Sequence, residues 1–388
     1  MAQFKTFLTY LACPECGEQF EPDEPQTFCH DCRSPLLAQY DLAAAAEVLT
    51  PERARLRLGR MWRWAEVLPV KDPRFQLTLG EGDTPLLELS RTGRTLGRPY
   101  LYMKDEAANP TGSFKARGLV MAVSKAAELG MTDLVMASAG NAGGALAAYA
   151  AQAGLNAHIY MPRSAPEINQ IEVRITGAGL VLVDGLISDA AARAAEDAEE
   201  NGWFSVSTFK EPYRVEGKKI MGYELAEDFS GVLPDAIIYP TGGGTGLVGM
   251  WKAFREMEEM GWIGSHRPRM ISVQSAGCAP VVEAIAHDRP RMRPWENPRT
   301  IAPGIQVPIA FADRLILSAI RESGGTAVAV SDHEIMQAQH RLAEQEGLFA
   351  APESAAALAG LKSLIQSNQI GPSDKVVVFN TASGLKYT

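Results

Sequence analysis

Short, mostly apolar runs alternate with longer amphipathic stretches from about residue 80 to the end of the chain. The runs are LVMAS (134–138), NAHIYM (156–161), LVLV (180–183), AIIYP (236–240), MISVQS (270–275) and VVVFN (376–380). Strands that are apolar along their whole length are typical of parallel sheets covered by helices on both faces. The pattern therefore predicts an α/β protein with parallel sheets and crossover helices.

The first 70 residues follow a different pattern, with four cysteines in the spacing C-x2-C-x12-C-x2-C. These are Cys13, Cys16, Cys29 and Cys32. Two CxxC pairs at this separation can close a tetrahedral sulfur site, which predicts a zinc-ribbon-like module over residues 1–40 that needs zinc to fold. Disulfides are the alternative, and they are not expected without a secretion signal. We expect residues 41–70 to form a helical connector.

Composition limits the classes of function. A chain of 388 residues, 46% of them hydrophobic, is long enough for two or more domains. Its net charge of -9 argues against nucleic acid or an anionic membrane surface as a partner. No apolar run approaches the roughly 18 residues of a membrane span, and the N-terminus has no signal-peptide layout. We therefore expect a soluble cytoplasmic protein with neither a membrane nor a nucleic-acid partner.

The stretch KDEAANPTGSFKARG (104–118) places an amine at the start of a helix. An Asn-Pro-Thr-Gly turn precedes Ser113, which we expect to cap a helix over residues 114–127. Lys115 then lies in the first turn, near the positive end of the helix dipole. That position is poor for a structural ammonium but suits an amine that must become neutral to form an imine. An ordinary surface lysine is the alternative interpretation.

The glycine-rich stretch PTGGGTG (240–246) joins a predicted strand to a predicted helix. Backbone N–H groups in such a turn, with the helix dipole behind them, bind phosphate without a cationic side chain. The spacing is neither GxGxxG nor a Walker motif, so neither a dinucleotide nor ATP is expected. A simple turn is the alternative. The candidate phosphate-binding residues are Gly242, Gly243, Gly244, Thr245 and Gly246.

Two further stretches follow predicted strands. SAGNAGG (138–144) opens a helix whose free amides could hold a carboxylate, with Asn141 as a neutral donor, although a plain N-cap is equally compatible. Thr381 offers a hydroxyl where the strand 376–380 ends. Taken together, one lysine, one phosphate loop and one carboxylate loop indicate pyridoxal phosphate (PLP) and a small amino-acid substrate.

The chain resembles the threonine synthase family of fold type II, tryptophan-synthase-β-like PLP enzymes. The resemblance rests on the CxxC pairs and on MWRWAEVLPV (61–70), EGDTPL (81–86), NPTGSFK (109–115), SAGN (138–141), PYRVEGKKI (212–220), ESGG (322–325), EGLFAAPESAAALAGL (346–361) and TASGLKY (381–387). It implies two doubly wound α/β domains with the active site between them, and a homodimer. The expected division is a zinc-ribbon-like module (1–40), a large PLP-binding domain (41–110 and 221–388) and a smaller α/β domain (111–220).

The resemblance also implies roles for individual residues. Lys115 would carry the cofactor as an internal aldimine and then move protons. Asn141 would hydrogen-bond the pyridine O3′, Thr381 would face the pyridine nitrogen, and the glycine loop would cradle the phosphate. The implied substrate contacts are Thr84, Ser138, Ala139, Gly140, Asn141 and Arg214. The implied reaction converts O-phospho-L-homoserine and water to L-threonine and phosphate.

Several positions depart from the family pattern. Ala116 follows the lysine where an aspartate is usual, and Ala139 and Ala142 stand where hydroxyl side chains are common. With Phe209 they make a less polar pocket, which favours a serine/threonine ammonia-lyase (dehydratase) or a β-replacement enzyme as the alternative. A zinc-ribbon interaction protein on an inactive scaffold is a third hypothesis, and an intact Lys115 argues against it. The cations that could meet the distal end of the substrate are Lys104, Arg117, Arg174 and Arg214.

Overall fold

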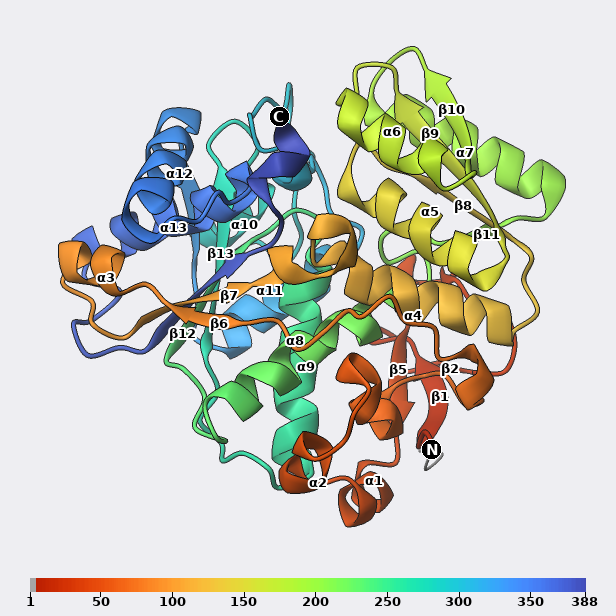
Figure 1. Cartoon of the computed structure of the whole chain (residues 1–388), viewed down its shortest axis with the longest axis horizontal. Helices are drawn as coiled ribbons and strands as arrows, with labels where there is room; N and C mark the ends of the chain where they lie inside the picture. The colour runs from red at the N-terminus through yellow and green to blue at the C-terminus, as the bar shows by residue number, and fades with distance from the viewer. Residues whose placement is uncertain (1–4) are drawn as a thin grey trace.

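The structure, a computed structural model, describes residues 5–388 and contains two mainly parallel sheets (Figure 1). The larger sheet has the order β14-β13-β12-β15-β7-β6, and only β6 runs antiparallel. Its strands are β6 (Leu86–Glu88), β7 (Leu101–Asp105), β12 (Ala236–Pro240), β13 (Arg269–Ser275), β14 (Ala327–Val330) and β15 (Val376–Asn380). The predicted α/β class is confirmed, and three of these strands coincide with predicted apolar runs to within a residue.

The smaller sheet is parallel throughout, with the order β10-β9-β8-β11. Its strands are β8 (Asp133–Ala137), β9 (Asn156–Pro162), β10 (Gly179–Val183) and β11 (Phe204–Ser205). It lies at the upper right of Figure 1, and α4 separates it from α8 and α9 of the larger unit. These two α/β units are the ones expected for fold type II, whereas the residue boundaries of the domains stay a prediction.

Helices cover both faces of each sheet (Figure 1). Helix α13 packs on one face of the larger sheet, while α7 and α5 pack against strands of the smaller one. The helices are α3 (Ser90–Leu96), α4 (Lys115–Glu128), α5 (Asn141–Ala153), α6 (Glu167–Ile175), α7 (Ile187–Asn201), α8 (Arg214–Asp228), α9 (Thr245–Glu259), α10 (Pro280–Ala286), α11 (Asp313–Glu322), α12 (Asp332–Glu346) and α13 (Pro352–Gln366). No helix of the described residues is long and apolar enough to cross a membrane.

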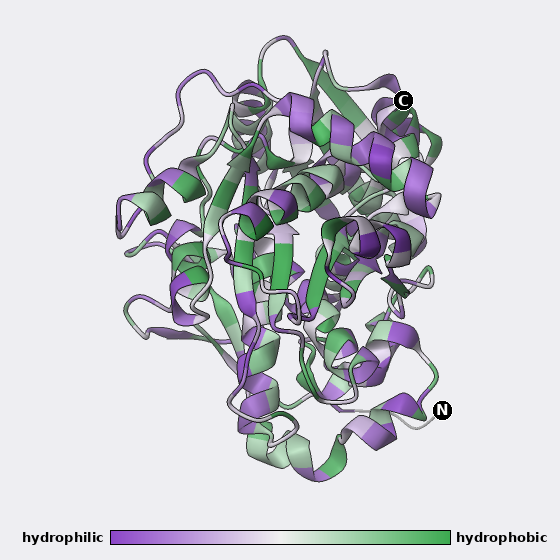
Figure 2. Cartoon of the chain, turned by 90° about the vertical axis from the view of Figure 1, so that its left-hand side faces the viewer, coloured by the Kyte–Doolittle hydropathy of each residue, from purple (hydrophilic) through white to green (hydrophobic). Residues whose placement is uncertain are grey.

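The central strands do not alternate between apolar and polar residues, and the position of the core explains why. Every residue of β12 and β15 is buried. Along β15, Val376 and Val378 belong to the apolar cluster that includes α13, while Val377 and Phe379 belong to the cluster that includes α8 and α9. Both faces of the strand are therefore inside the protein. Figure 2 shows the same arrangement, with hydrophobic strands in the interior and helices of mixed hydropathy around them.

The N-terminal part forms a small layer in the lower part of Figure 1, and its buried apolar residues join the core cluster of α4, α8 and α9. Strands β1 (Leu8–Ala12), β2 (Gln19–Phe20) and β5 (Leu37–Tyr40) make a three-stranded sheet, and β3 (Phe28–Cys29) pairs antiparallel with β4 (Ser34–Pro35). The connector then folds as α1 (Leu42–Val48), α2 (Pro51–Arg55) and the 3-10 helix η1 (Arg60–Val67). The remaining 3-10 helices are η2 (Pro73–Phe75), η3 (Glu106–Ala108), η4 (Pro110–Gly112), η5 (Pro303–Ile305) and η6 (Gly384–Tyr387).

Candidate active site

The carboxyl ends of β7, β12 and β15 bring three predicted site segments to one edge of the larger sheet. These strands are parallel, so their ends meet at the same edge, which is the usual ligand site of open α/β sheets. The turn after β7 leads to Lys115, the turn after β12 is the glycine loop, and β15 ends one residue before Thr381. The backbone N–H of Phe114 donates to the carbonyl of Thr381 at 3.0 Å, which ties the first and third segments together.

Lys115 is the first residue of α4, so the helix begins one residue later than predicted. Ser113 is not the N-cap, but its hydroxyl accepts a long hydrogen bond of 3.4 Å from the Lys115 backbone N–H. Burial of the amine, together with the positive charge of Arg214, lowers the pKa of Lys115 to about 8, against the opposing effect of Glu353. The amine is therefore neutral in a substantial fraction of molecules near pH 8.

The glycine loop leaves the start of α9 open. Gly244 has a left-handed backbone, with φ of 80°, and no side chain caps the helix after it. The first N–H groups of α9 are consequently free to bind an anion from outside the helix. The amine of Lys218 donates to Thr245 Oγ1 at 3.0 Å, so a basic side chain also faces this loop.

The loop before α5 is ordered by Ser138. Its hydroxyl accepts hydrogen bonds from the N–H groups of Gly140 and Gly143 at 3.3 and 3.0 Å. Ala139 beside it is partly buried against the apolar core. The hydroxyl of Ser138 thus fixes the conformation of the loop that leads into α5, whose first residue is Asn141.

Asn141 is linked to the C-terminal end of the chain, a partner that the sequence analysis missed. Its Nδ2 donates to the hydroxyl of Tyr387 at 3.2 Å. Neighbouring Lys386 forms an ion pair with Glu172 on α6. The 3-10 helix η6 therefore connects the smaller α/β unit to the strand end that carries Thr381. The motif TASGLKY contained this residue, but nothing in it indicated a contact 246 residues away.

Arg214 is the one of the four candidate cations that keeps free hydrogen-bonding capacity inside the protein. It is 1% exposed at the start of α8, and its Nη1 donates to the carbonyl of Val206 at 2.9 Å and to Thr208 Oγ1 at 3.3 Å. Its Nε has no partner within residues 5–388. A buried guanidinium with an unused donor is suited to an anionic ligand.

The other candidate cations are engaged elsewhere. Lys104 lies 2.8 Å from Asp228 and 3.2 Å from Glu224, and Arg174 is exposed on α6. Arg117 pairs with both Glu106 and Glu224, at 2.6 and 2.7 Å. These pairings indicate structural roles for Lys104 and Arg117, because their charges are balanced by buried carboxylates.

Thr84 belongs to the same buried network. Its hydroxyl donates to Glu106 Oε1 at 2.7 Å and accepts from Arg117 Nη2 at 3.0 Å. Its only side-chain proton is thus given to a carboxylate of the protein. The structure places the Thr84 hydroxyl in the network that fixes α4 against α8. A substrate contact of Thr84 stays a prediction of the sequence.

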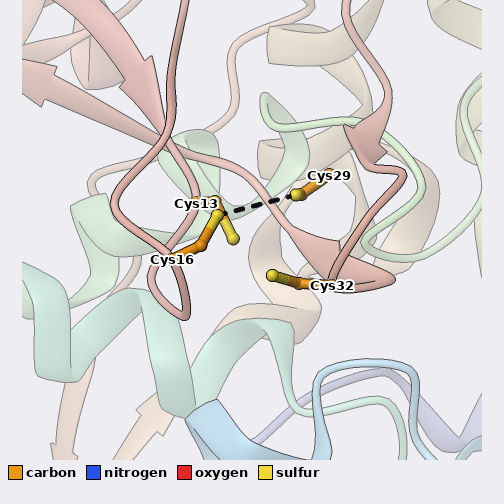
Figure 3. Close-up of side chains that lie close together, drawn as sticks. All are labelled: Cys13, Cys16, Cys29 and Cys32. Carbon is orange, nitrogen blue, oxygen red and sulfur yellow. Dashed lines mark hydrogen bonds between the residues drawn. The ribbon is translucent and has the colours of Figure 1, made fainter.

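The four N-terminal cysteines converge on one point. Their sulfur atoms lie within 4.8 Å of one another, and Figure 3 shows the side chains pointing inward from two turns of the chain. Cys13 and Cys29 are buried, while Cys16 is exposed. Four thiols in this arrangement match the ligand set of a tetrahedral metal site.

Comparisons with known proteins define first a class and then a family. Residues 77–382 match the family model of pyridoxal-phosphate dependent enzymes. The chain is 36% identical over 378 residues to the threonine synthase of Methanosarcina acetivorans, which covers 97% of this chain and 92% of the relative. It is also 36% identical over 375 residues to the threonine synthase of Methanocaldococcus jannaschii, covering 96% and 92%. The chain belongs to the threonine synthase family of PLP-dependent enzymes.

Solved structures support the fold. A processed threonine deaminase isoform 2 of Solanum lycopersicum superposes with a TM-score of 0.67 at 22% identity, covering 77% of this chain and 79% of that one. A serine racemase of maize superposes with a TM-score of 0.66 at 22% identity, covering 78% and 88%. At this level of identity the likeness concerns the architecture alone.

The side chains present fit PLP. A lysine whose pKa is lowered to about 8 can supply a neutral amine, and the uncapped start of α9 can accept a phosphate. Thr381 is 4% exposed and supplies a neutral hydroxyl at the end of β15. These features lie on one sheet edge, as the cofactor requires.

We predict that cofactor uptake by the apoenzyme follows the titration of Lys115. Only the neutral amine attacks an aldehyde, so the uptake rate should rise about tenfold per pH unit below pH 8 and level off above it. An ordinary lysine, with a pKa of 10.5, would show a rise that continues past pH 10. Stopped-flow absorbance of the apoenzyme mixed with PLP measures this profile, and a rate still climbing at about pH 10 would contradict the prediction.

Proposed function

We propose that this protein converts O-phospho-L-homoserine and water to L-threonine and phosphate. The observation that carries the proposal is the unpartnered Nε of buried Arg214, near which the amines of Lys115 and Lys218 lie. Glu211 is the buried carboxylate that acts on this guanidinium, but it forms no ion pair with it. A buried guanidinium with an unused donor is unfavourable unless an anionic ligand compensates it. Cofactor and substrate each bring a phosphate group, and the name of the relatives, threonine synthase, agrees with the product.

Each site residue has a role under this proposal. Bound PLP supplies an electron sink for negative charge at the substrate Cα. Lys115 would hold the cofactor, and its amine would remove and return protons at the substrate carbons. The loop at Ser138 presents backbone amides to the substrate carboxylate, and Arg214 binds the substrate phosphate.

The cofactor contacts are proposed on the same basis. Asn141 would hold the O3′ oxygen of the ring. Thr381 would face the ring nitrogen through a hydroxyl, which would not keep that nitrogen protonated as a carboxylate would. The glycine loop at the start of α9 would hold the cofactor phosphate, through Gly242, Gly243, Gly244, Thr245 and Gly246.

A second candidate function has one observation in its favour. Ala142 and Phe209 are 8% and 1% exposed, and both face the apolar core where the family often places polar side chains. Fewer donors stabilise a dianionic phosphate less well. A serine/threonine ammonia-lyase or a β-replacement enzyme needs no phosphate site for its substrate, and it would use the same lysine and cofactor.

A product assay on the PLP-loaded protein separates the two. O-phospho-L-homoserine, L-threonine, L-serine and O-phospho-L-serine are offered in parallel, and we expect L-threonine and inorganic phosphate from the first. Arg214→Gln should raise KM for O-phospho-L-homoserine by about 10- to 100-fold, the range of one charge-assisted hydrogen bond. The exposed Arg174→Gln is the matched control. Formation of a 2-oxo acid from threonine or serine, without phosphate release from the first compound, would overturn the proposal.

We further propose that the cysteine cluster holds one structural zinc ion. The four sulfur atoms lie within 4.8 Å of one another, and a module of about 40 residues has too small a core to be stable alone. We expect about one equivalent of zinc per chain by elemental analysis, and a loss of most of it in Cys29→Ser, with the absorbance of bound PLP retained. Purified wild-type protein without metal would contradict this. The homodimer and the cytoplasmic location stay predictions of the sequence.

A further inference from the structure

Lys218 is a buried lysine without a carboxylate partner. Its side chain is fully buried in α8, and no carboxylate oxygen of residues 5–388 lies within ion-pairing distance of its Nζ. Adjacent Lys219 is different, because it lies 2.7 Å from Glu216 and 2.9 Å from Glu256. Two consecutive lysines of one helix therefore serve different purposes, and only the second has its charge balanced by the protein.

The Nζ of Lys218 points at the phosphate loop. It donates to Thr245 Oγ1 at 3.0 Å, and Thr245 is the first residue of α9. The same Nζ lies 3.9 Å from the ring centroid of Phe114, and the Nζ of Lys115 lies 4.0 Å from that centroid. The two amines thus share one aromatic ring, with one directed to the imine position and the other to the glycine loop.

The backbone makes room for this lysine. A Cβ atom on Gly118 would lie 2.8 Å from Lys218 Cε and 3.0 Å from the carbonyl of Arg214. Any side chain at position 118 would therefore displace the lysine stem from its present course. The glycine three residues after Lys115 lets α4 and α8 approach closely enough for both amines to reach one site.

The charge balance at this point calls for an anion. Burial, reinforced by the charges of Lys115 and Arg214, lowers the pKa of Lys218 well below its ordinary value, while Glu211 and Glu106 act weakly in the other direction. A dianionic phosphate beside Nζ would restore the charged form of Lys218. It would also accept hydrogen bonds from the N–H groups of Nζ that do not donate to Thr245. The uncapped N–H groups of α9 face the same place.

We infer that Lys218 is a ligand of the cofactor phosphate and adds a full positive charge to the backbone site of the glycine loop. The inference rests on the proposed place of the cofactor phosphate, but not on which amino acid is the substrate. It separates Lys218 from Arg214, which the proposed function assigns to the substrate phosphate.

The test compares PLP with pyridoxal, which lacks the phosphate. Dissociation constants are measured by absorbance titration of the apoenzymes of wild type, Lys218→Met and Lys218→Gln. We expect Lys218→Met to weaken PLP binding by about 10- to 100-fold and to leave pyridoxal binding unchanged within about twofold. Lys218→Gln, which keeps a neutral donor, should fall between. The exposed Lys362→Met controls for loss of one positive charge.

Two further measurements keep the inference open to refutation. Inorganic phosphate should compete with PLP for wild-type apoenzyme and lose most of that effect in Lys218→Met. Apo Lys218→Met should unfold no earlier than wild type, because an apolar side chain in this buried position does not have to be desolvated as the amine does. Equal losses for PLP and pyridoxal, or no loss for either, would overturn the inference. So would unchanged PLP binding with a raised KM for O-phospho-L-homoserine alone, which would place Lys218 at the substrate phosphate while leaving the proposed function intact.

Discussion

Lys115→Ala is expected to lose turnover by more than about 10³-fold, the largest effect on activity of any single change in this protein. Under the proposed function, the substitution removes the amine that binds the cofactor and the base that moves the substrate protons. A positioned general base alone contributes about 10²- to 10⁴-fold, so the combined loss is at least of that size. The amine is partly neutral near pH 8 only because burial and Arg214 lower its pKa.

The loss should be separable from a loss of folding. Lys115→Arg keeps the positive charge at the same position but cannot bind the cofactor covalently under these conditions, so it should be equally inactive. Both variants should lack the absorbance band of lysine-bound PLP and still bind PLP through the glycine loop at the start of α9. The exposed Lys362→Ala should behave as wild type. Turnover by Lys115→Ala within about tenfold of wild type would refute the assignment of this lysine.

Local sequence patterns predicted the parts of the site that depend on local structure. The apolar runs located β12 and β15 because both strands are buried on both faces, and the glycine loop between β12 and α9 has a turn whose conformation needs glycine at position 244. The position of Lys115 followed from the turn before it. The start of its helix was misplaced by one residue, and Ser113 is not its N-cap.

Side-chain partnerships could not be predicted in the same way. The sequence alone could not rank the candidate anion ligands Lys104, Arg117 and Arg214. The first two are neutralised by Glu224, which lies more than 100 residues further along the chain. Arg117 meets a carboxylate 107 residues away, and Lys218 meets Thr245 across 27 residues. A KK pair inside a helix ordinarily indicates an exposed face, so the burial of Lys218 could be found only from the packing of α8 between α4 and α9.

The buried network around Arg117 shows how a residue next to Lys115 can stabilise the helix that carries it. Arg117 is fully buried and gives five short contacts of 2.6 to 3.0 Å, to Glu106, Glu224 and Thr84. The charges of Arg117 and Lys104 hold the pKa of Glu224 far below its ordinary value despite its burial. The helix that carries Lys115 is therefore fixed to the turn after β7 and to α8 through the charge of Arg117, two residues after Lys115.

We expect Arg117→Met to lower the free energy of unfolding by about 3–5 kcal/mol, the largest effect on stability among single changes at an ion pair here. The variant leaves Glu106 without an ion-pair partner among residues 5–388, while Glu224 keeps Lys104 at 3.2 Å. The cost therefore arises mainly at Glu106, whose charge cannot be solvated. Urea titration of the apoenzyme, followed by far-UV circular dichroism, measures the change.

The matched control is Arg163→Met, since Arg163 lies 2.6 Å from Asp184 in an ion pair that is largely exposed. Its loss should cost no more than about 1 kcal/mol, because water already solvates both charges. Adding Glu106→Gln to Arg117→Met should recover part of the loss, whereas two independent effects would add. A loss below about 1 kcal/mol in Arg117→Met would mean that water reaches Glu106 freely. In that case the network would not be what holds Lys115 at the edge of the sheet.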